Sequence, residues 1–506
     1  MTGLPIYSSS QIRKLEERAA SASIGATNGS TTGTLMERAG LAAAEFARGL
    51  CGDTAKSILV VAGPGNNGGD AFEVAAHLKR WFFRVSVVFA GEREKLSGDA
   101  RAALGKWEAV GGSLLTQIPE DARFDLAVDG LFGIGLTRAL AGPHAELVHA
   151  LNALDAPILA LDIPSGIDAD TGAIMGCAVR AAHTVTFIAH KPGLLTLDGP
   201  DHCGELRLDT LGLDPASLLS PQGRLIDAAA IAVAVKRRRK NYHKGQAGSV
   251  GVLGGASGMV GAAVIAGRAA LKCGAGRVYL GMLTPRPPYL DYSQPELMLR
   301  KPAELLAPRF LDALIAGPGM GTSKGAAVLL RAALKSPAPL LLDADALNLL
   351  AANRAMLAAV SKRVGATIMT PHPAEAARLL GEETRTIQSD RVTSARLQAQ
   401  RCDSCVVLKG NGSVVAAPDG KWWINPSGNP GMASAGMGDA LSGIVASLVA
   451  QGAEPLDALI AGVYLHGAAA DELVAAGTGP IGISASEGPS HQPGLQNRRL
   501  TGPEHP

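Results

Sequence analysis

The sequence predicts an α/β protein that is divided into two domains. Short, continuously apolar segments typical of buried strands alternate with helix-like segments, which indicates parallel sheets covered on both faces. Glycine-rich loops follow several of these segments in both halves of the chain. The length of 506 residues exceeds what one ordinary core accommodates and is compatible with two large domains.

Composition and charge exclude several classes of protein. With 47% apolar and 18% charged residues, the chain has the composition of a compact globular protein. A net charge of +2 gives no reason to expect nucleic acid or a membrane as a partner. The N-terminus lacks the apolar core of a signal peptide, and no apolar run approaches the length that spans a bilayer. Together with scattered cysteines, which are typical of a reducing compartment, this predicts a cytoplasmic protein.

The first half contains the elements of a parallel sheet in order. Two amphipathic helical segments, at 10–18 and 34–40, come first. Buried strands are then predicted at 57–62, 84–89, 126–129, 158–162 and 183–187. In such folds ligands bind beyond the carboxyl ends of the strands.

Three of these strands end in loops that carry glycines and acids, at residues 63–70, 129–135 and 162–172. We expect them to converge on one crevice. The first loop is not a dinucleotide fingerprint, because Pro64 and two asparagines occupy it. Asparagine, aspartate and serine oxygens together could hold a hard cation. The alternative is that each acid serves only as a turn or cap residue.

The boundary between the halves is expected in the proline-bearing, aperiodic stretch 213–225. The predicted domains are residues 1–214 and 225–485, joined by a linker at 215–224. The polar segment 486–506 has no apolar pattern and is predicted to be a disordered tail.

The second half repeats the α/β pattern with different loops. Strands are predicted at 249–253, 277–280, 313–316 and 339–343, with an alanine-rich helix that ends at Lys272. Loops follow the strands at 254–261, 317–321, 370–373 and 409–413.

The most informative loop is the glycine-rich run at 428–439, which leads into an apolar helix. Glycines 436 and 438 remove side chains from the turn, so backbone N–H groups at the helix start can attract an anion. An aspartate at such a place, Asp439, makes sense as a base that acts on a hydroxyl while the N–H groups hold a phosphate. The alternative is that Asp439 is a plain N-cap.

These loops resemble two known enzyme families. The N-terminal loops resemble those of the NAD(P)H-hydrate epimerases, and the C-terminal loops are similar to those of the ADP- or ATP-dependent NAD(P)H-hydrate dehydratases. The resemblance covers about residues 10–485. It implies a Rossmann-like three-layer α/β/α domain followed by a ribokinase-like α/β/α domain.

For the epimerase half, the resemblance implies a set of substrate-binding residues and a potassium site. The substrate residues are Asn66, Asn67, Gly68, Gly69, Asp70, Gly133, Ile134, Gly135, Leu136, Thr137, Arg138, Ala139 and Asp162. K⁺ would be held by Asn67, Asp129 and Ser165. Either Asp162 or Asp70 could act as acid or base. The family usually has glycine where this chain has Ala71, and we expect activity to survive that change because alanine favours the helix.

For the dehydratase half, the resemblance implies Asp439 as the catalytic residue. Substrate contacts fall on Ala262, Gly321, His372 and Asp439. Nucleotide contacts fall on Lys409, Gly410, Asn411, Gly412, Ser413 and Gly438. ADP is the expected co-substrate, and Mg²⁺ would bridge its oxygens.

The implied activity is repair of reduced nicotinamide nucleotides that have added water to the ring. The epimerase half would interconvert the R and S hydrates at C6, and the dehydratase half would convert the S form to NAD(P)H, with AMP and phosphate as the other products. The alternative is a ribokinase-like kinase for a vitamin alcohol, with a non-catalytic N-terminal binding domain. A homo-oligomer is expected. The preference for NADHX or NADPHX, and that for ADP or ATP, stay open.

Overall fold

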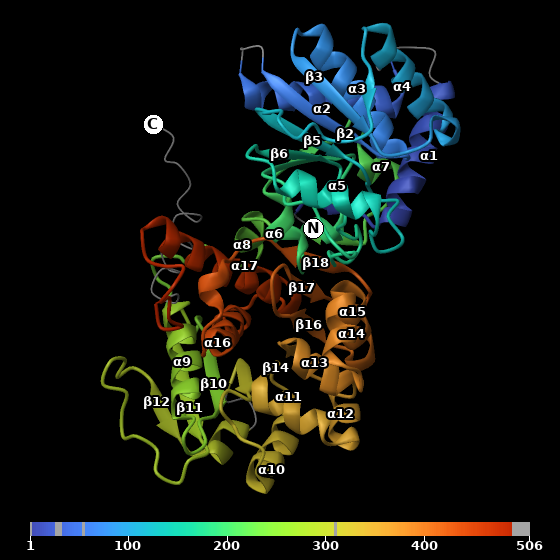
Figure 1. The fold of residues 1–506 in the computed structure, drawn as a ribbon. Helices are drawn as coiled ribbons and strands as arrows, with labels where there is room; N and C mark the ends of the chain where they lie inside the picture. Colours follow the sequence, from blue (N-terminus) through green and yellow to red (C-terminus); the bar gives the residue numbers. More distant parts are fainter. Residues whose placement is uncertain (1–2, 26–32, 53–55, 308–310, 488–506) are drawn as a thin grey trace. The chain divides into compact units, whose positions relative to one another are not determined.

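The computed structural model describes residues 3–25, 33–52, 56–307 and 311–487 (Figure 1). The chain forms two compact units, Pro5–Gln222 and Gly223–Pro506, the second of which also includes Met1–Leu4. The predicted tail, from residue 488 onward, lies outside the described residues.

The N-terminal unit is built on a parallel sheet with strand order β4-β3-β2-β5-β6-β7-β8. The strands are β2 (Ser57–Ala62), β3 (Arg84–Phe89), β4 (Leu114–Leu115), β5 (Leu126–Gly130), β6 (Ile158–Leu161), β7 (His183–Phe187) and β8 (Glu205–Asp209). The helices are α1 (Ser9–Gly25), α2 (Leu35–Cys51), α3 (Asn66–Arg80), α4 (Gly98–Ala109), α5 (Pro143–Asn152), α6 (Gly199–Cys203) and α7 (Pro215–Leu218).

Alternate residues of β2 pack in two cores on opposite faces of this sheet. Ile58 and Val60 pack in one core with α1 to α4, whereas Leu59 and Val61 pack in the other with α5 (Figure 1). The predicted parallel sheet covered on both faces is thus confirmed. Residues 66–70, expected in a loop, form the first turns of α3, because Gly65 is the N-cap and the chain turns helical directly after it.

The C-terminal unit contains a longer sheet with strand order β9-β18-β17-β16-β15-β14-β13-β10-β11-β12. Its strands are β9 (Gly223–Leu225), β10 (Ser249–Gly254), β11 (Arg277–Met282), β12 (Met298–Arg300), β13 (Ala313–Ala316), β14 (Leu340–Leu342), β15 (Thr367–Met369), β16 (Cys405–Leu408), β17 (Ser413–Ala416) and β18 (Trp422–Asn425). The pairs β16–β17 and β17–β18 are antiparallel, and the other pairs in this order are parallel.

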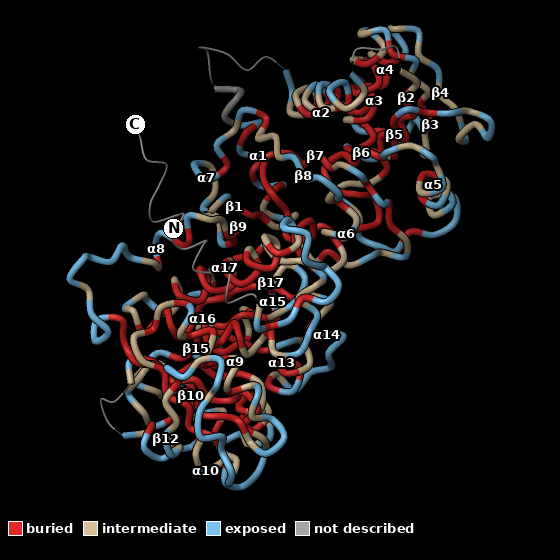
Figure 2. The backbone as a smooth tube through the Cα atoms, turned by 90° about the vertical axis from the view of Figure 1, so that its left-hand side faces the viewer, coloured by how far each residue is buried: buried red, intermediate tan, exposed pale blue. Residues whose placement is uncertain are grey.

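Helices cover both faces of this sheet as well. They are α8 (Ala229–Ala234), α9 (Val260–Lys272), α10 (Lys324–Ala333), α11 (Ala344–Ala351), α12 (Arg354–Val360), α13 (Pro373–Leu380), α14 (Thr384–Ser389), α15 (Arg391–Cys402), α16 (Met437–Ala450) and α17 (Pro455–Ala475). Buried residues dominate the strands and α16 (Figure 2).

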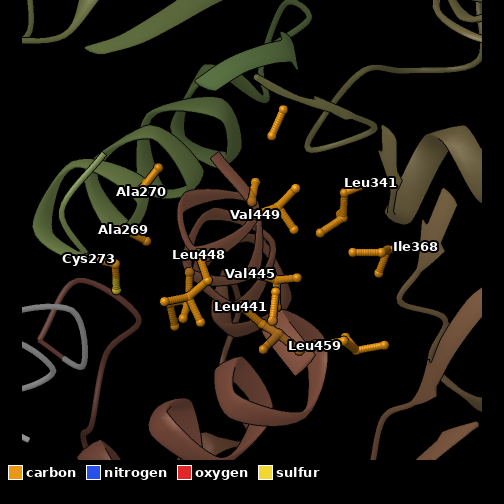
Figure 3. Close-up of a cluster of buried hydrophobic side chains, with 14 of the residues drawn as sticks. Ala269, Ala270, Cys273, Leu341, Ile368, Leu441, Val445, Leu448, Val449 and Leu459 are labelled. Carbon is orange, nitrogen blue, oxygen red and sulfur yellow. The ribbon is translucent and has the colours of Figure 1, made fainter. Parts of the chain in front are cut away.

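Helix α16 is the centre of the C-terminal core. Its apolar side chains lie between the small residues Ala269 and Ala270 of α9 and the strand residues Leu341 and Ile368 (Figure 3). Gly443 allows this close approach, since a Cβ there would lie 2.1 Å from the carbonyl oxygen of Ala266. The start of α16, which carries Asp439, is therefore rigidly placed.

The segment predicted as a linker, 215–224, contains α7 and part of β9. The side chain of Asp214 caps α7 by accepting a hydrogen bond from Ala216 N at 3.2 Å. Strand β9 pairs with β18, and Leu225 N donates to Leu4 O at 2.8 Å. Leu4, near the N-terminus, thus lies within the C-terminal unit.

Among the described residues, α17 alone is long and apolar enough to cross a membrane, which differs from the expectation that no run reaches that length. Most of it is buried inside the fold, against the sheet and α16. Its composition is accounted for by its place as a core helix.

Candidate functional site

The carboxyl ends of β2, β5 and β6 open onto a cavity of about 1170 Å³ in the N-terminal unit. Its walls come from α1, the starts of α2 and α3, and the loops after β5 and β7. The predicted substrate residues that line it are Asn66, Asn67, Asp70, Gly133, Ile134, Gly135 and Asp162. The strand-end loops of this unit therefore meet at one cavity.

The other predicted substrate residues lie outside the lining of this cavity, namely Gly68, Gly69, Leu136, Thr137, Arg138 and Ala139. The two glycines have a packing role in α3. A Cβ at Gly68 would lie 1.9 Å from the carbonyl oxygen of Gly63, and one at Gly69 would lie 2.6 Å from the sulfur of Met36. Gly68 thus allows α3 to start directly after the turn that follows β2, and Gly69 allows α2 to pack closely against α3.

Asp129 and Ser165 form a buried hydrogen-bonded pair at the end of β5. The Asp129 carboxylate accepts hydrogen bonds from Ser165 Oγ at 2.6 Å, Ser165 N at 2.8 Å and Leu131 N at 3.2 Å. All these donors are neutral. Burial raises the pKa of Asp129 to about 6, although the hydrogen bonds from Ser165 act in the opposite direction.

Asn67 is the third residue assigned to the potassium ion, and it is buried in the first turn of α3. Within the described part of the chain, its Nδ2 is buried without a hydrogen-bond partner. A Cβ at Gly133 would lie 3.3 Å from its Oδ1, so the loop after β5 packs against this amide. The atom of Asn67 that could bind a cation is Oδ1, not the unpartnered Nδ2. With a carboxylate that has only neutral partners, this oxygen fits a weakly held monovalent cation.

Asp162 is held by an ion pair at the end of β6. The Lys191 ammonium donates to Asp162 Oδ1, and Phe187 N donates to the same oxygen at 3.3 Å. Asp162 has a φ of 65°, a left-handed conformation that non-glycine residues rarely adopt and that is common at functional sites.

Asp70 and Glu16 add two more carboxyl groups to the same cavity. Burial raises the pKa of Asp70 well above its ordinary value, and the negative charges of Asp162 and Glu16 add to the effect. Burial also raises the pKa of Glu16, again with a contribution from Asp162. The cavity wall therefore holds more carboxyl groups than cations beside them.

Glu16 and Lys191 were not among the predicted site residues. Glu16 lies on the amphipathic helix α1, where a glutamate has no feature that separates it from a solvated one. Lys191 stands in a Lys-Pro-Gly stretch shortly after β7, which was a weak signal. Two of its acceptors, Thr186 and Phe187, are close to it in sequence, but Asp162 is brought to it only by the fold.

In the C-terminal unit, Asp439 lies in the first turn of α16. The N-cap is Gly436, with a φ of 89° and no side-chain cap, and Asp439 occupies the third helical position. The alternative of Asp439 as a plain N-cap is thus wrong. The N–H groups of this first turn are available to an anion.

A buried ion pair lies beside this helix start. Lys409 Nζ donates to Asp343 Oδ1 at 3.0 Å, and Ser442 Oγ donates to Asp343 Oδ2 at 2.9 Å. A Cβ at Gly438 would lie 3.0 Å from Lys409 Nζ, so the lysine faces the first turn of α16. Although burial acts to raise it, Lys409 holds the pKa of Asp343 below its ordinary value.

The pKa of Asp439 is shifted in the opposite direction to that of Asp343. Burial and the negative charge of Asp343 raise the pKa of Asp439 to about 7, while Lys409 acts to lower it. A carboxyl group with a pKa near neutrality is suited to accept a proton at physiological pH.

The predicted nucleotide residues Lys409 to Ser413 form the turn between β16 and β17. Gly410 has a φ of 144°, and a Cβ there would lie 2.8 Å from the Arg391 guanidinium. Ser413 Oγ closes the turn by donating to Gly410 O at 2.9 Å. The turn is therefore rigid, with Lys409 at its start.

His372 is the N-cap of α13 and takes part in a capping box with Glu375. His372 Nδ1 accepts from Ala374 N at 3.1 Å, while the side chain is 46% exposed. Gly321 N donates to Asp345 Oδ2 at 2.8 Å. Ala262, in α9, lies beside the loop that holds Gly321, since a Cβ at Gly319 would lie 3.1 Å from Ala262 Cβ.

Metal ligands of the usual kind are not grouped in the part of the chain that the structure describes. No cluster of three or more His, Cys, Asp or Glu side chains is placed to hold a metal ion there. The Asn67, Asp129 and Ser165 set is of a different kind, with mostly neutral oxygens.

Two family models match the chain. Residues 32–193 match the model described as the YjeF-related protein N-terminus, and residues 250–483 match the model described as NAD(P)H-hydrate dehydratase.

Known proteins are similar to nearly the whole chain. The bifunctional NAD(P)H-hydrate repair enzyme of Escherichia coli (strain K12) is 40% identical, with 94% of this chain and 92% of the relative covered. That of Coxiella burnetii is 38% identical, with 95% and 97% covered. Among solved structures, an ADP/ATP-dependent NAD(P)H-hydrate dehydratase from Bacillus subtilis, co-crystallised with ATP and Mg²⁺, is 28% identical. It covers 54% of this chain and 98% of its own, with a TM-score of 0.47.

Proposed function

Since the chain belongs to the family of bifunctional NAD(P)H-hydrate repair enzymes, we propose that its two units carry out the two steps of that repair. The Rossmann-like N-terminal unit interconverts the R and S hydrates at C6. The ribokinase-like C-terminal unit converts the S hydrate to NAD(P)H. The vitamin-kinase alternative has less support, because the relatives that match over nearly the whole length are repair enzymes.

The dehydration step rests on one observation, the position of Asp439 at the start of α16 beside Lys409. Hydroxide is a poor leaving group, so the C6 hydroxyl is first phosphorylated. Asp439 accepts the hydroxyl proton as the oxygen attacks the terminal phosphorus of ADP, and AMP leaves. The N–H groups of the first turn of α16 and the Lys409 ammonium stabilise the transferring phosphoryl group.

Phosphate then leaves C6, C5 loses a proton to the departing phosphate or to water, and the C5–C6 double bond returns, which gives NAD(P)H, AMP and phosphate in total. When bound, Mg²⁺ would neutralise part of the phosphate charge. We propose ADP, rather than ATP, as the phosphoryl donor.

We place a potassium ion at Asn67, Asp129 and Ser165. The buried Asp129 carboxylate has only neutral donors, and the amide oxygen of Asn67 and the hydroxyl of Ser165 would complete a set of oxygen ligands. The ion would supply a fixed positive charge that balances Asp129 and orders the loop after β5. Replacement of K⁺ by choline should therefore slow epimerisation and leave dehydration of the S form unchanged.

The direct test starts from a mixture of R and S NADPHX with the purified protein, Mg²⁺, K⁺ and ADP or ATP, followed by NADPH absorbance. Recovery of both isomers, faster than spontaneous epimerisation, is expected. Recovery of the S fraction alone would mean that the N-terminal unit is not an epimerase.

The variant Asp439→Asn should abolish dehydration while epimerisation continues. Dehydration that survives this substitution would show that Asp439 does not have the assigned role.

A further inference from the structure

Two carboxyl groups on the wall of the N-terminal cavity have contrasting environments. Asp162, at the end of β6, is 9% exposed and receives the Lys191 ammonium on its Oδ1. Asp70, in α3, lines the same cavity. No ion pair joins Asp70 to a lysine or arginine among residues 3–25, 33–52, 56–307 and 311–487. One carboxyl group is thus matched with a cation and the other is not.

Lys191 is committed to this pair. It is 1% exposed, and its ammonium donates to Asp162 Oδ1, to Thr186 Oγ1 at 2.9 Å and to Phe187 O at 2.8 Å. An ammonium has three N–H donors, and all three are used. Lys191 therefore has no proton to offer a substrate, and its ammonium fixes the orientation of the Asp162 carboxylate.

The charged groups around Asp70 are mostly negative. Asp162, Glu16 of α1 and Glu73 of α3 all place negative charge near it, while Lys191 is the opposing cation. Glu73 is itself paired with Lys106, at 2.6 Å. Burial and these acids favour the protonated form of Asp70, and two carboxyl groups in contrasting environments are typical of acid–base sites.

We propose that Asp162 is the base and Asp70 the acid of the epimerase, and that Lys191 is a positioning residue that holds the Asp162 carboxylate in place. This inference rests on the proposed epimerase function of the N-terminal unit. The sequence leaves open which of Asp162 and Asp70 is the acid and which the base, and it does not point to Lys191.

The two groups together account for a balanced ring opening. Asp162 takes the proton of the C6 hydroxyl, the C6–N1 bond breaks with its electron pair moving to N1, and Asp70 gives its proton to N1. The product is an open-chain aldehyde. Rotation about C5–C6 presents the other face of the aldehyde, and N1 attacks C6 while both protons return. Each cycle leaves Asp162 ionised and Asp70 protonated.

Loss of the C6 hydroxyl as water would not reset the site in this way. Asp70 would protonate the leaving hydroxyl, and re-addition of water from the other face would leave the proton on Asp162. The protonation states would then be exchanged after each turnover. The contrasting environments of the two acids favour the ring-opening route, which uses both in their resting forms.

The test uses the full-length variants Asp70→Asn, Asp162→Asn and Lys191→Met, with separation of R and S NADPHX by chromatography. Asp201→Asn, an exposed acid of the same unit outside the cavity, is the matched control. Asp70→Asn is the sharpest variant, because asparagine imitates the neutral carboxyl group and should preserve the fold. Hydrogen exchange in β2 and β6 reports whether the unit stays folded.

Asp70→Asn and Asp162→Asn should each slow epimerisation by about 100-fold or more, with Asp201→Asn unchanged. Dehydration of the S form should continue in every variant. In the wild type, the rate should fall at high pH as Asp70 is ionised. Lys191→Met should lower kcat of epimerisation more than it changes KM, because Asp162 loses the donor that holds it in place.

A folded Asp70→Asn protein that epimerises at the wild-type rate would overturn the inference. So would a folded Lys191→Met protein that keeps the wild-type kcat of epimerisation. Incorporation of one solvent oxygen-18 at C6 for each epimerisation would overturn the ring-opening step. A wild-type protein that does not accelerate epimerisation at all would instead refute the proposed function.

Discussion

Removal of Lys409 should destabilise the C-terminal unit because it leaves a buried charge without its partner. The Asp343 side chain is 1% exposed and that of Lys409 is 22% exposed, with 3.0 Å between Nζ and Oδ1. Loss of one partner of a buried pair costs about 3–5 kcal/mol. Because a fifth of Lys409 is in contact with solvent, we expect Lys409→Met to cost about 3 kcal/mol, at the lower end of that range.

A second variant separates this stability effect from nucleotide binding. In the double variant Lys409→Met, Asp343→Asn, neither charge of the pair remains and Ser442 still has an acceptor. Most of the stability that Lys409→Met loses should therefore return. Affinity for ADP should stay about 10-fold or more below the wild-type value in both variants, since a hydrogen bond to a charged group is missing.

Hydrogen exchange in β16 and α16 measures the free energy of local opening, and initial rates against ADP concentration give KM. The reasoning about the buried pair would be refuted by a double variant that is no more stable than Lys409→Met. Unchanged KM values in both variants would remove Lys409 from the nucleotide site.

Four further outcomes are expected. The kcat/KM of dehydration should rise with pH through about 7, because Asp439 must be ionised to accept a proton; a rate that is flat between pH 5 and 9 would contradict this. Gly438→Ala should raise KM for ADP, because the new methyl group would lie 3.0 Å from Lys409 Nζ. The same change should stabilise the start of α16 by up to about 1 kcal/mol, as measured by hydrogen exchange. Ala71→Gly should lower the stability of the N-terminal unit by about 1 kcal/mol, since glycine weakens a helix interior, with epimerase activity kept in the NADPHX assay.

The parallel sheets and the strand-end loops could be predicted because they depend on local patterns. Runs such as 57–62 are apolar throughout, which marks a strand buried on both faces. Strand ends in a parallel sheet share an edge, so Asp162 and the turn after β2 were expected near one another. Asp439 stood out because a glycine-rich turn and an apolar helix adjoin it in sequence.

Other features depend on contacts between distant parts of the chain. Glu16 lines the cavity because α1 packs in the same core as α2, α3 and α4. Lys191 donates to two residues close to it in sequence, but its ion-pair partner Asp162 lies 29 residues away. Residues 66–70, by contrast, turn helical for a local reason, since Gly68 closely approaches the carbonyl oxygen of Gly63, and this is missed when glycines and asparagines are taken as signs of a loop.

Leu4, at the beginning of the chain, belongs to the unit that is synthesised last. At about 5–20 residues per second, its hydrogen-bond partner Leu225 is made roughly 10–45 s later. The N-terminal unit can fold in that interval, before Leu4 has its hydrogen-bond partner. The residues of the C-terminal unit are thus not contiguous in the sequence, because the N-terminal unit, Pro5–Gln222, lies between Leu4 and Gly223. A dehydratase unit expressed from residue 223 would keep the pairing of β9 with β18 but lack Leu4, whose carbonyl oxygen accepts the hydrogen bond from Leu225 of β9.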